Sequence, residues 1–367
     1  MTTPLILCLF NRPQQAAGLI EGLRVHRPPR ILVIADGPRQ DHPEDCARCQ
    51  LSLDSLLRID WPCAITENVS ARNLGCDLRL TSGLDWAFGL VEEAIVLEDD
   101  THPDPSLFPW AEAMLRRWGN DPGVGMICGR NALVRWGRPG ASHLRCRRGN
   151  LWGWAARSSA WHATRKVDLA GDPDAAPADL AAAVPDPLLV SFYAPVLAAI
   201  RAGTPCAWDV THILRHLLSG RHALVAPTNL VRNTGIGAEA SRMTHTADFN
   251  AALPVGAAPP QFATEDSAAD GPEELDAQFD HLALLAQLLS RCVDPQAALK
   301  LARFTLPGVG NAPASRFQQH LEPFRRPAQS LALLEHLRAC GVVSPHLEAL
   351  LEALTPVATI RSGPAPA

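Results

Sequence analysis

The sequence predicts an α/β fold in which helices flank a mostly parallel sheet, followed by a C-terminal helical region. The first observation is the alternation of short apolar runs with segments of helical periodicity between residues 5 and 128, which is typical of βαβ units. The second is the helical spacing of apolar residues after residue 272. The third is composition, because 367 residues with 47% hydrophobic and 19% charged side chains provide for a large core.

Five short apolar runs have the length and the polar flanks of buried strands. They span residues 5–10, 30–34, 63–69, 94–97 and 124–128. Segments of helical spacing lie between them, at residues 14–25, 42–59, 78–88 and 106–118. In a parallel sheet every strand-to-helix turn lies at the same edge, so we expect the polar residues that follow these strands to meet there.

The later part of the chain is expected to contain more helices than strands. Helices are predicted at residues 188–202, 210–218, 273–289, 330–340 and 345–354, and a strand at 223–226. The stretch 167–187 is rich in Asp, Ala and Pro with weak periodicity, which predicts a loop or lid. These patterns divide the chain into an α/β domain, a Pro/Ala linker and a helical region, at residues 1–250, 251–272 and 273–367.

Charge and composition exclude several classes of partner. The net charge of −5 and the pI of about 6.2 give no electrostatic reason to expect a nucleic acid or an anionic membrane. No transmembrane segment is expected, because no apolar run approaches the roughly 20 residues that a spanning helix needs. The N-terminus lacks a basic region and predicts a strand instead of a signal peptide. The ten scattered cysteines, several of them in apolar strand patterns, are typical of reduced thiols, so we expect a cytoplasmic and, from its Ala, Pro, Arg and Leu bias, bacterial protein.

Three consecutive acids, Glu98, Asp99 and Asp100, follow the apolar run 94–97. Carboxylates this close repel one another and raise each other's pKa values unless a positive group lies between them. Their oxygen atoms suit Mg²⁺ or Mn²⁺, and open α/β sheets bind ligands beyond the carboxyl ends of their strands. The triplet therefore predicts a metal and phosphate site. The alternative is a solvated turn, which acids also favour.

Six short motifs occur in a fixed order along residues 4–245. They are FNRP at 10–13, ADGP at 35–38, RNLGC at 72–76, LEDD at 97–100, LWGWA at 151–155 and NTGIG at 233–237. Together they resemble glycosyltransferases of the Rossmann-like GT-A fold, the nucleotide-diphospho-sugar transferase superfamily. Within that fold the sequence is similar to the β-1,2-N-acetylglucosaminyltransferase of complex N-glycan synthesis, whose acid motif is also Glu-Asp-Asp. The resemblance implies that residues 1–250 bind the nucleotide sugar and carry the catalytic residues.

The resemblance also implies a reaction and a metal. A metal-dependent, inverting enzyme would move a hexose or N-acetylhexosamine from a nucleotide-diphosphate sugar, with a UDP-sugar favoured, to a glycan, glycolipid or small-molecule acceptor. Mn²⁺ or Mg²⁺ would stabilise the charge that develops on the leaving diphosphate. Asp100 would be the metal ligand, and Glu98 and Asp99 would face the donor sugar. His245 would join the metal or the diphosphate when its loop closes, the alternative for a lone histidine being a structural role.

Residues that follow the first three predicted strands are the candidates for nucleotide binding. Arg12 would bind the diphosphate, because a guanidinium group can bond two oxygen atoms at once. By the resemblance, Asp36 would accept a hydrogen bond from the base, and Arg72 and Asn73 would line the pocket. The alternatives are a surface arginine, a turn stabilised by Asp36 and a loop that caps the next helix.

Asp209 is the candidate general base, which must be a carboxylate or histidine near the acceptor hydroxyl group. It follows a tryptophan at the start of an expected helix, where the similar enzymes carry their base, and its alternative is a helix N-cap. Rivals for this role are four acids of the stretch 167–187: Asp168, Asp172, Asp179 and Asp186. Trp152 and Trp154 would form a wall against an acceptor sugar, with core packing as the alternative.

Two other hypotheses for the function stay open. A sugar-1-phosphate nucleotidyltransferase would use a similar sheet, but residues 11–14 lack the glycines of a phosphate loop after the first strand. A non-catalytic sugar- or partner-binding protein on the same scaffold would not need the intact acid triplet. The arginines between residues 130 and 148 could hold an acidic acceptor, although a solvated face explains them better.

Overall fold

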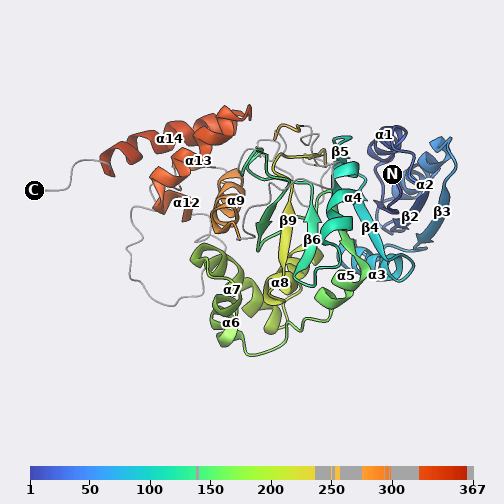
Figure 1. Ribbon diagram of the computed structural model, residues 1–367, viewed down its shortest axis with the longest axis horizontal. Coiled ribbons are helices and arrows are strands. Elements are labelled where there is room, and N and C mark those ends of the chain that lie inside the picture. Colours follow the sequence, from blue (N-terminus) through green and yellow to red (C-terminus); the bar gives the residue numbers. More distant parts are fainter. Residues whose placement is uncertain are drawn as a thin grey trace, which may run out of the picture.

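An eight-stranded sheet forms the centre of the fold, with helices packed on both of its faces (Figure 1). The computed structural model describes residues 1–137, 140–235, 249, 253–256, 275–292, 294–296, 298 and 322–361. The strands of the sheet are β1 (Leu5–Leu9), β2 (Arg30–Ala35), β3 (Ala64–Val69), β4 (Glu93–Glu98), β6 (Val124–Cys128), β7 (Leu144–Cys146), β8 (Trp154–Arg157) and β9 (His222–Val225). A separate two-stranded sheet contains β5 (Thr101–Pro103) and β10 (Val231–Asn233). The α/β class predicted from the sequence is confirmed.

The large sheet is mostly parallel, as expected, and its strands are ordered β3-β2-β1-β4-β8-β6-β9-β7. β1 pairs in parallel with β2 and β4, β2 with β3, and β6 with β9, whereas β8 and β7 run antiparallel to their neighbours. Cys8 of β1 lies opposite Glu98 of β4, and Leu9 lies opposite Ala35 of β2. The carboxyl ends of β1, β2 and β4 are therefore level with one another at one edge.

Helices cover the two faces of the sheet and enclose two separate cores. Those of the first two-thirds of the chain are α1 (Pro13–Leu23), α2 (Asp45–Asp54), the 3-10 helix η1 (Ser55–Arg58), α3 (Cys76–Phe88), α4 (Leu107–Trp118), α5 (Ser158–Arg165), the 3-10 helix η2 (Pro173–Ala175), α6 (Ala176–Ala183), α7 (Pro187–Arg201) and α8 (Trp208–Leu218). Leu5 and Leu7 of β1 face the core closed by α1 and α4, and Ile6 and Cys8 face the core closed by α3, α5, α7 and α8. This alternation follows from the two-residue period of a strand.

The C-terminal region is helical, as the apolar spacing predicts. Its helices are α9 (Ala277–Ser290), α12 (Glu322–Arg325), α13 (Pro327–Ala339) and α14 (Pro345–Arg361), and α12, α13 and α14 lie at the end of the molecule away from α1 and β3 (Figure 1). Leu284, Leu334 and Leu347 belong to the same core cluster as Ile6. The linker at 251–272 lies almost entirely outside the described residues, so the proposed domain boundary stays a prediction.

The weak periodicity of the stretch 167–187 predicted a loop or lid. The structure instead contains η2 and α6 in this stretch. Ala176 and Leu180 are buried one turn apart, and this single pair fixes α6 against the core. Alanine has the highest helix propensity, and the proline near the start of α6 is compatible with a first helical turn. A helix with so narrow an apolar face leaves little periodicity in the sequence, which explains the wrong prediction.

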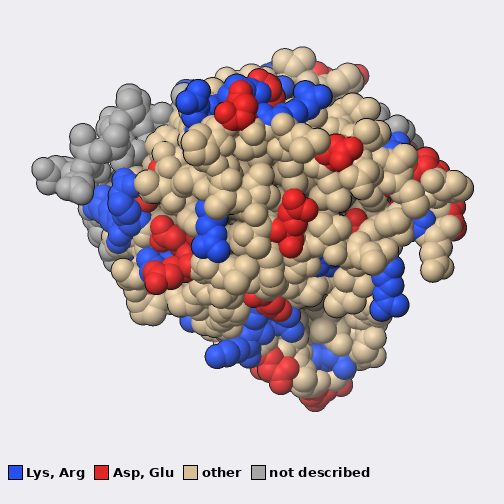
Figure 2. All heavy atoms as spheres, turned by 90° about the vertical axis from the view of Figure 1, so that its right-hand side faces the viewer, with Lys and Arg blue, Asp and Glu red and all other residues tan. Residues whose placement is uncertain are grey.

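Charged side chains are dispersed over the side of the molecule that carries β3. Figure 2 shows this side, on which groups of basic and acidic residues are separated by broad uncharged areas. Within the described part of the chain, no helix has the length and apolar character to cross a membrane.

Candidate functional site

The acid triplet lies at the carboxyl end of β4, beside the chain that leaves β1. The backbone N–H of Phe10 donates a hydrogen bond to Asp99 Oδ2 at 3.2 Å. Nη1 of Arg12 lies 3.3 Å from Asp99 Oδ1 and also contacts Asp100 Oδ2. The parallel pairing of β1 with β4 brings these residues together although they are almost 90 positions apart. The positive group expected between the acids is thus present in the structure, and it is the guanidinium of Arg12.

One guanidinium group does not balance the negative charge of this site. Burial, followed by the charge of Asp100, raises the pKa of Asp99 to about 7 despite the opposing effect of Arg12. Burial and the charges of Asp100, Asp99 and Asp209 raise the pKa of Glu98 well above its usual value. Burial and the neighbouring carboxylates therefore disfavour the charged forms of Glu98 and Asp99, an effect that a bound cation would offset.

Asp100 is held by the segment that follows β10. The backbone N–H of Thr234 donates to the backbone oxygen of Asp100 at 2.8 Å, and Asn233 Nδ2 lies 3.4 Å from Asp100 Oδ1. Asn233 Oδ1 in turn accepts a hydrogen bond from the N–H of Gly235 at 2.8 Å. A Cβ atom on Gly235 would lie only 2.0 Å from Asp100 Oδ2. The Asp100 side chain therefore packs directly against Gly235, and this close approach requires a residue without a side chain.

These features fit a divalent cation bound by few protein atoms. Among the described residues, no three acids, histidines or cysteines are grouped closely enough to enclose a metal ion. Mg²⁺-like ions in phosphate-binding enzymes commonly take one or two carboxylates and complete their shell with phosphate oxygens and water. Asp100, whose Oδ2 lies against Gly235 and contacts Arg12, is the candidate ligand of such a site. His245, the second expected ligand, lies outside the described residues.

Asp209 lies in the first turn of α8 and is exposed. Its charge contributes to the raised pKa of Glu98, which places it within electrostatic range of the acid triplet. The N-cap residue of α8 is Ala207, so the capping role that was the alternative for Asp209 is not realised. The backbone N–H of Trp208 donates to Asp77 Oδ1 at 2.7 Å, which fixes the start of α8 against α3.

The four rival acids all accept hydrogen bonds within the stretch that contains them or from neighbouring helices. Asp186 caps α7 and lies 2.9 Å from His281 Nδ1, and Asp179 lies 2.7 Å from Arg201 Nη2. Asp172 caps η2 in the same way, accepting from a backbone N–H two residues later. Asp168 accepts the N–H of Ala170. These contacts stabilise turns and helix ends, which leaves Asp209 as the candidate base.

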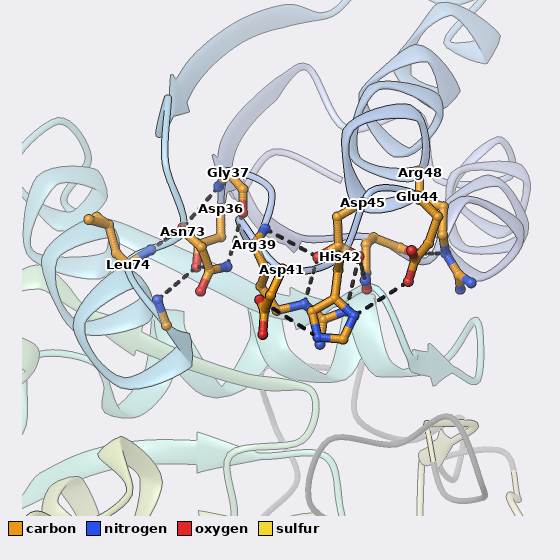
Figure 3. Close-up of polar contacts among 12 residues, drawn as sticks. Asp36, Gly37, Arg39, Asp41, His42, Glu44, Asp45, Arg48, Asn73 and Leu74 are labelled. Atoms are coloured by element: carbon orange, nitrogen blue, oxygen red, sulfur yellow. Dashed lines mark hydrogen bonds and ion pairs between the residues drawn. The ribbon is translucent and has the colours of Figure 1, made fainter.

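The loops after β2 and β3 are joined through Asp36 (Figure 3). Its Oδ1 accepts the backbone N–H groups of Gly37 and Leu74, both at 2.9 Å, and its Oδ2 accepts from Asn73 Nδ2 and the Gly75 N–H, both at 3.1 Å. Both carboxylate oxygens thus already have two donors from the protein. Asp36 and Asn73 lie at the expected edge of the sheet, where Asn73 donates a hydrogen bond to Asp36. Their contact with a base stays a prediction.

The exposed Arg72 lies in the loop that Asp36 holds. A Cβ atom on Gly37 would lie 2.6 Å from backbone atoms of Arg72, so the two loops approach each other as closely as their backbones allow. The turn at Gly75 has a φ angle of 77°, which is the left-handed region that glycine adopts without strain. The loop is therefore built to present Arg72 at this edge, and its place in a nucleotide pocket stays a prediction.

A second cluster of charged residues lies beside the first and was not predicted from the sequence. Asp45, at the start of α2, accepts hydrogen bonds from Arg39 Nε at 2.6 Å, Arg39 Nη2 at 2.9 Å and Asn11 Nδ2 at 2.7 Å (Figure 3). The hydrogen bonds from Arg39 are the main cause of a pKa of Asp45 well below its usual range. This cluster fixes Asn11, the residue before Arg12. Its only sequence signal is the position of Asn11 after a strand.

The structure separates the two tryptophans that were expected to contact an acceptor. Trp154 is only 2% exposed and its ring lies 6.2 Å from that of Phe88 and 6.0 Å from that of Trp161, so the predicted acceptor contact is corrected to core packing. Trp152 is only partly buried, and the guanidinium carbon of Arg130 lies 4.3 Å from the centre of its ring. Trp152 alone stays a candidate for acceptor binding.

The described arginines near the end of this stretch, Arg147 and Arg148, connect parts of the fold and do not form a binding face of their own. Arg148 is a partner of Tyr193 and Gln287, and Arg147 contacts the backbone of Gly220. These side chains connect β7 with α7, α9 and the turn before β9. The expectation of an acidic acceptor on this cluster therefore receives no support from its geometry.

Among known proteins, distant similarity is found in solved structures. No family model and no curated protein sequence matches the chain. Among solved structures, it is similar to a mannosyltransferase, PcManGT, from Pyrobaculum calidifontis in complex with GDP-Man and Mn²⁺, with a TM-score of 0.39 and 15% sequence identity over 98% of this chain and 87% of that one. A similarity of this size transfers no function, so the function has to be argued from the residues of the site.

Proposed function

We propose that the protein is a metal-dependent glycosyltransferase that moves a sugar from a nucleotide-diphosphate donor to an acceptor hydroxyl group. The observation that carries the proposal is the grouping of acids at the carboxyl end of β4, where Asp99 and Asp100 follow Glu98 and both contact Arg12. Open α/β sheets bind their ligands at this edge. The resemblance of the six motifs adds a UDP-sugar as the favoured donor, a hexose or N-acetylhexosamine as the sugar, and inversion as the stereochemical course.

The donor side of the site is formed by the loops after β1, β2, β3 and β4. In this proposal Asp100 binds Mn²⁺ or Mg²⁺, which when present offsets the charge of the leaving diphosphate. Arg12 supplies a second positive group for the phosphate oxygens, and Glu98 and Asp99 bind hydroxyl groups of the donor sugar. Asp36 holds the loop that presents Arg72 and Asn73 to the nucleotide.

The acceptor side is formed by the start of α8 and by Trp152. The carboxylate of Asp209 accepts the proton of the acceptor hydroxyl group while the oxygen of that hydroxyl group attacks the donor sugar. Attack from the side opposite the leaving diphosphate inverts the anomeric centre. The partly buried ring of Trp152 provides a flat apolar surface for the acceptor sugar. His245 remains a proposed additional ligand of the metal or the diphosphate.

A thermal-shift screen tests the proposal and separates it from the two other hypotheses. UDP and GDP are expected to raise the melting temperature in the presence of Mn²⁺ and to have little effect without it. A preference for nucleoside triphosphates would favour a nucleotidyltransferase. No response to any nucleotide would favour a non-catalytic protein. Hydrolysis or transfer assays with the stabilising UDP- or GDP-sugar would then identify the donor.

A further inference from the structure

We propose that Arg12 is an internal counter-ion that occupies the metal site of the free protein and moves to the donor diphosphate when a cation enters. The consequence is that the divalent cation binds weakly alone and tightly together with a nucleoside diphosphate. This inference rests on the proposed donor site. It concerns the order and the coupling of binding, which the presence of an acid triplet does not determine.

The first argument is the position of the guanidinium group. Nη1 of Arg12 contacts Asp100 Oδ2 and lies 3.3 Å from Asp99 Oδ1. Asp100 Oδ2 is also the oxygen that packs against Gly235, so the glycine and Arg12 both lie against it. A cation that binds this oxygen and the guanidinium that contacts it therefore compete for one place. The two can occupy the site together only if the Arg12 side chain moves.

The second argument is that only the side chain of Arg12 is free to move. The backbone oxygen of Arg12 accepts the N–H of Ala16 at 2.9 Å in the first turn of α1, and Pro13 fixes the next residue. Asn11 is held by Asp45 through its side chain and by Arg48 Nε through its backbone oxygen at 2.8 Å. The side chain of Arg12 is 19% exposed and has rotatable bonds along its length. A fixed backbone with a mobile guanidinium suits an exchange between two anionic partners at one edge.

The third argument is charge. Arg12 is the positive group in contact with Asp99 and Asp100, which follow Glu98 at the end of β4. Arg39 is engaged by Asp45 instead. If a cation replaces Arg12 at the acids, the displaced guanidinium needs a new anion, and a diphosphate provides one. The diphosphate draws Arg12 away from the acids and so favours cation binding, and the cation releases Arg12 and so favours diphosphate binding. Such coupling is reciprocal by thermodynamic necessity.

The experiment measures Mn²⁺ binding without nucleotide and UDP or GDP binding with and without Mn²⁺, by electron paramagnetic resonance of free Mn²⁺ and by calorimetry. In the wild-type protein, the nucleoside diphosphate is expected to tighten Mn²⁺ binding at least tenfold. Arg12→Met is expected to bind Mn²⁺ alone about tenfold more tightly than the wild type and to lose most of this coupling. Arg12→Lys, which keeps the charge but not the planar group, should lie between the two.

Arg39→Met is the matched control, because it removes a guanidinium from the adjacent cluster and leaves the acid triplet intact. It should leave both Mn²⁺ affinity and coupling at wild-type values, with correct folding checked by circular dichroism. Unchanged Mn²⁺ affinity and full coupling in Arg12→Met would overturn the exchange and leave the proposed function standing. Tighter Mn²⁺ binding in Arg12→Met, with no nucleoside diphosphate bound by either protein, would overturn the proposed function and the transfer to a diphosphate.

Discussion

Two carboxylate–arginine clusters lie side by side at one edge of the sheet and have opposite electrostatic character. Asp45 accepts four hydrogen bonds, three from Arg39 and one from Asn11, and its pKa is well below the usual range. Asp99 has a comparable partner in Arg12, yet its pKa is raised to about 7, because burial and Asp100 outweigh that partner. A contact between an aspartate and an arginine therefore accompanies a lowered aspartate pKa in one cluster and a raised aspartate pKa in the neighbouring cluster.

This difference in pKa indicates that the Asp45 cluster stabilises the fold, whereas the Asp99 and Asp100 cluster is suited to binding a ligand. A buried carboxylate whose hydrogen bonds are complete stabilises the fold and has nothing to offer a ligand. A cluster that keeps excess negative charge is costly for the isolated protein, and such clusters concentrate where a ligand supplies the missing charge. Removal of Asp45 should therefore affect stability, and removal of Asp100 should affect binding. Four measurements can break or sharpen this contrast.

Asp100→Asn gives the largest expected effect. The variant should lose Mn²⁺-dependent binding of UDP or GDP, and turnover should fall by a factor on the order of 10³ or more, because a bound metal supplies several kcal/mol of transition-state stabilisation. Its melting temperature should stay at or above that of the wild type, since one of the repelling charges is gone. Calorimetry and thermal unfolding measure the two effects. An unchanged, metal-dependent nucleotide affinity would exclude Asp100 as the ligand.

Asp209→Asn should reduce turnover by a factor on the order of 10², which is the range of general-base catalysis. Nucleotide affinity with Mn²⁺ should stay near the wild-type value, because Asp209 is placed on the acceptor side. Steady-state kinetics at saturating donor, together with calorimetry, separate the two quantities. Asp179→Asn, in the rival stretch, is the control and should keep its turnover. Wild-type turnover in Asp209→Asn would mean that the base lies elsewhere.

Asp45→Asn should lower the free energy of unfolding by about 2 kcal/mol, because it weakens charge-assisted hydrogen bonds to a buried group. Folding lowers the pKa of Asp45, so the carboxylate contributes to the free energy of unfolding at pH values above its pKa in the unfolded chain. This contribution is lost as the pH falls below that pKa. Denaturant unfolding at pH 7 measures the loss. Asp41→Asn, with a side chain 86% exposed in the same segment, should be neutral. A selective loss of nucleotide affinity without a loss of stability would contradict the structural role of this cluster.

The smallest expected effect at pH 7 comes from two buried histidines of α8, because their contribution to stability changes only as the pH falls below about 6.5. Burial lowers the pKa values of His212 and His216 from 6.5 to about 3, so both stay neutral in the fold where the unfolded chain takes up protons. The free energy of unfolding should therefore fall between about pH 6.5 and pH 3, by about 1.4 kcal/mol per pH unit for each histidine. His212→Phe keeps the stacking on Trp161 and should make this dependence shallower. Denaturant unfolding at pH 7, 6 and 5 checks the slope, and an unchanged slope would contradict the assignment.

The parts that local patterns determine could be predicted from the sequence. The runs that became β1, β2, β4 and β6 are short and largely apolar, and β3 is a mostly exposed strand that contains Thr66, Glu67 and Asn68. The parallel arrangement of β1, β2, β3 and β4 follows from the helices between them. The same argument places Arg12, Asp36 and the acid triplet at one edge. Their positions needed only the rule that strand-to-helix turns of a parallel sheet share an edge.

Parts that depend on distant contacts could not be predicted. The hydrogen bond between Asn11 and Asp45 joins positions 34 residues apart, and no local sequence pattern in either segment predicts it. Trp152 and Trp154 are two positions apart, as residues on one face of a strand would be. Gly153 has a φ angle of 59°, and this turn sends the two rings into different cores. A single backbone angle thus decides which tryptophan can meet a substrate.

The carboxylate of Asp280 in α9 has a consequence for how the chain folds during synthesis. It accepts the backbone N–H groups of Arg147 at 2.6 Å and Arg148 at 2.8 Å, in the turn that leaves β7. Those two amides emerge from the ribosome more than a hundred residues before their acceptor does. Since N-terminal parts of a nascent chain fold first, the β1–β4 half can form early, whereas the β7 border of the sheet matures only after translation has passed α9.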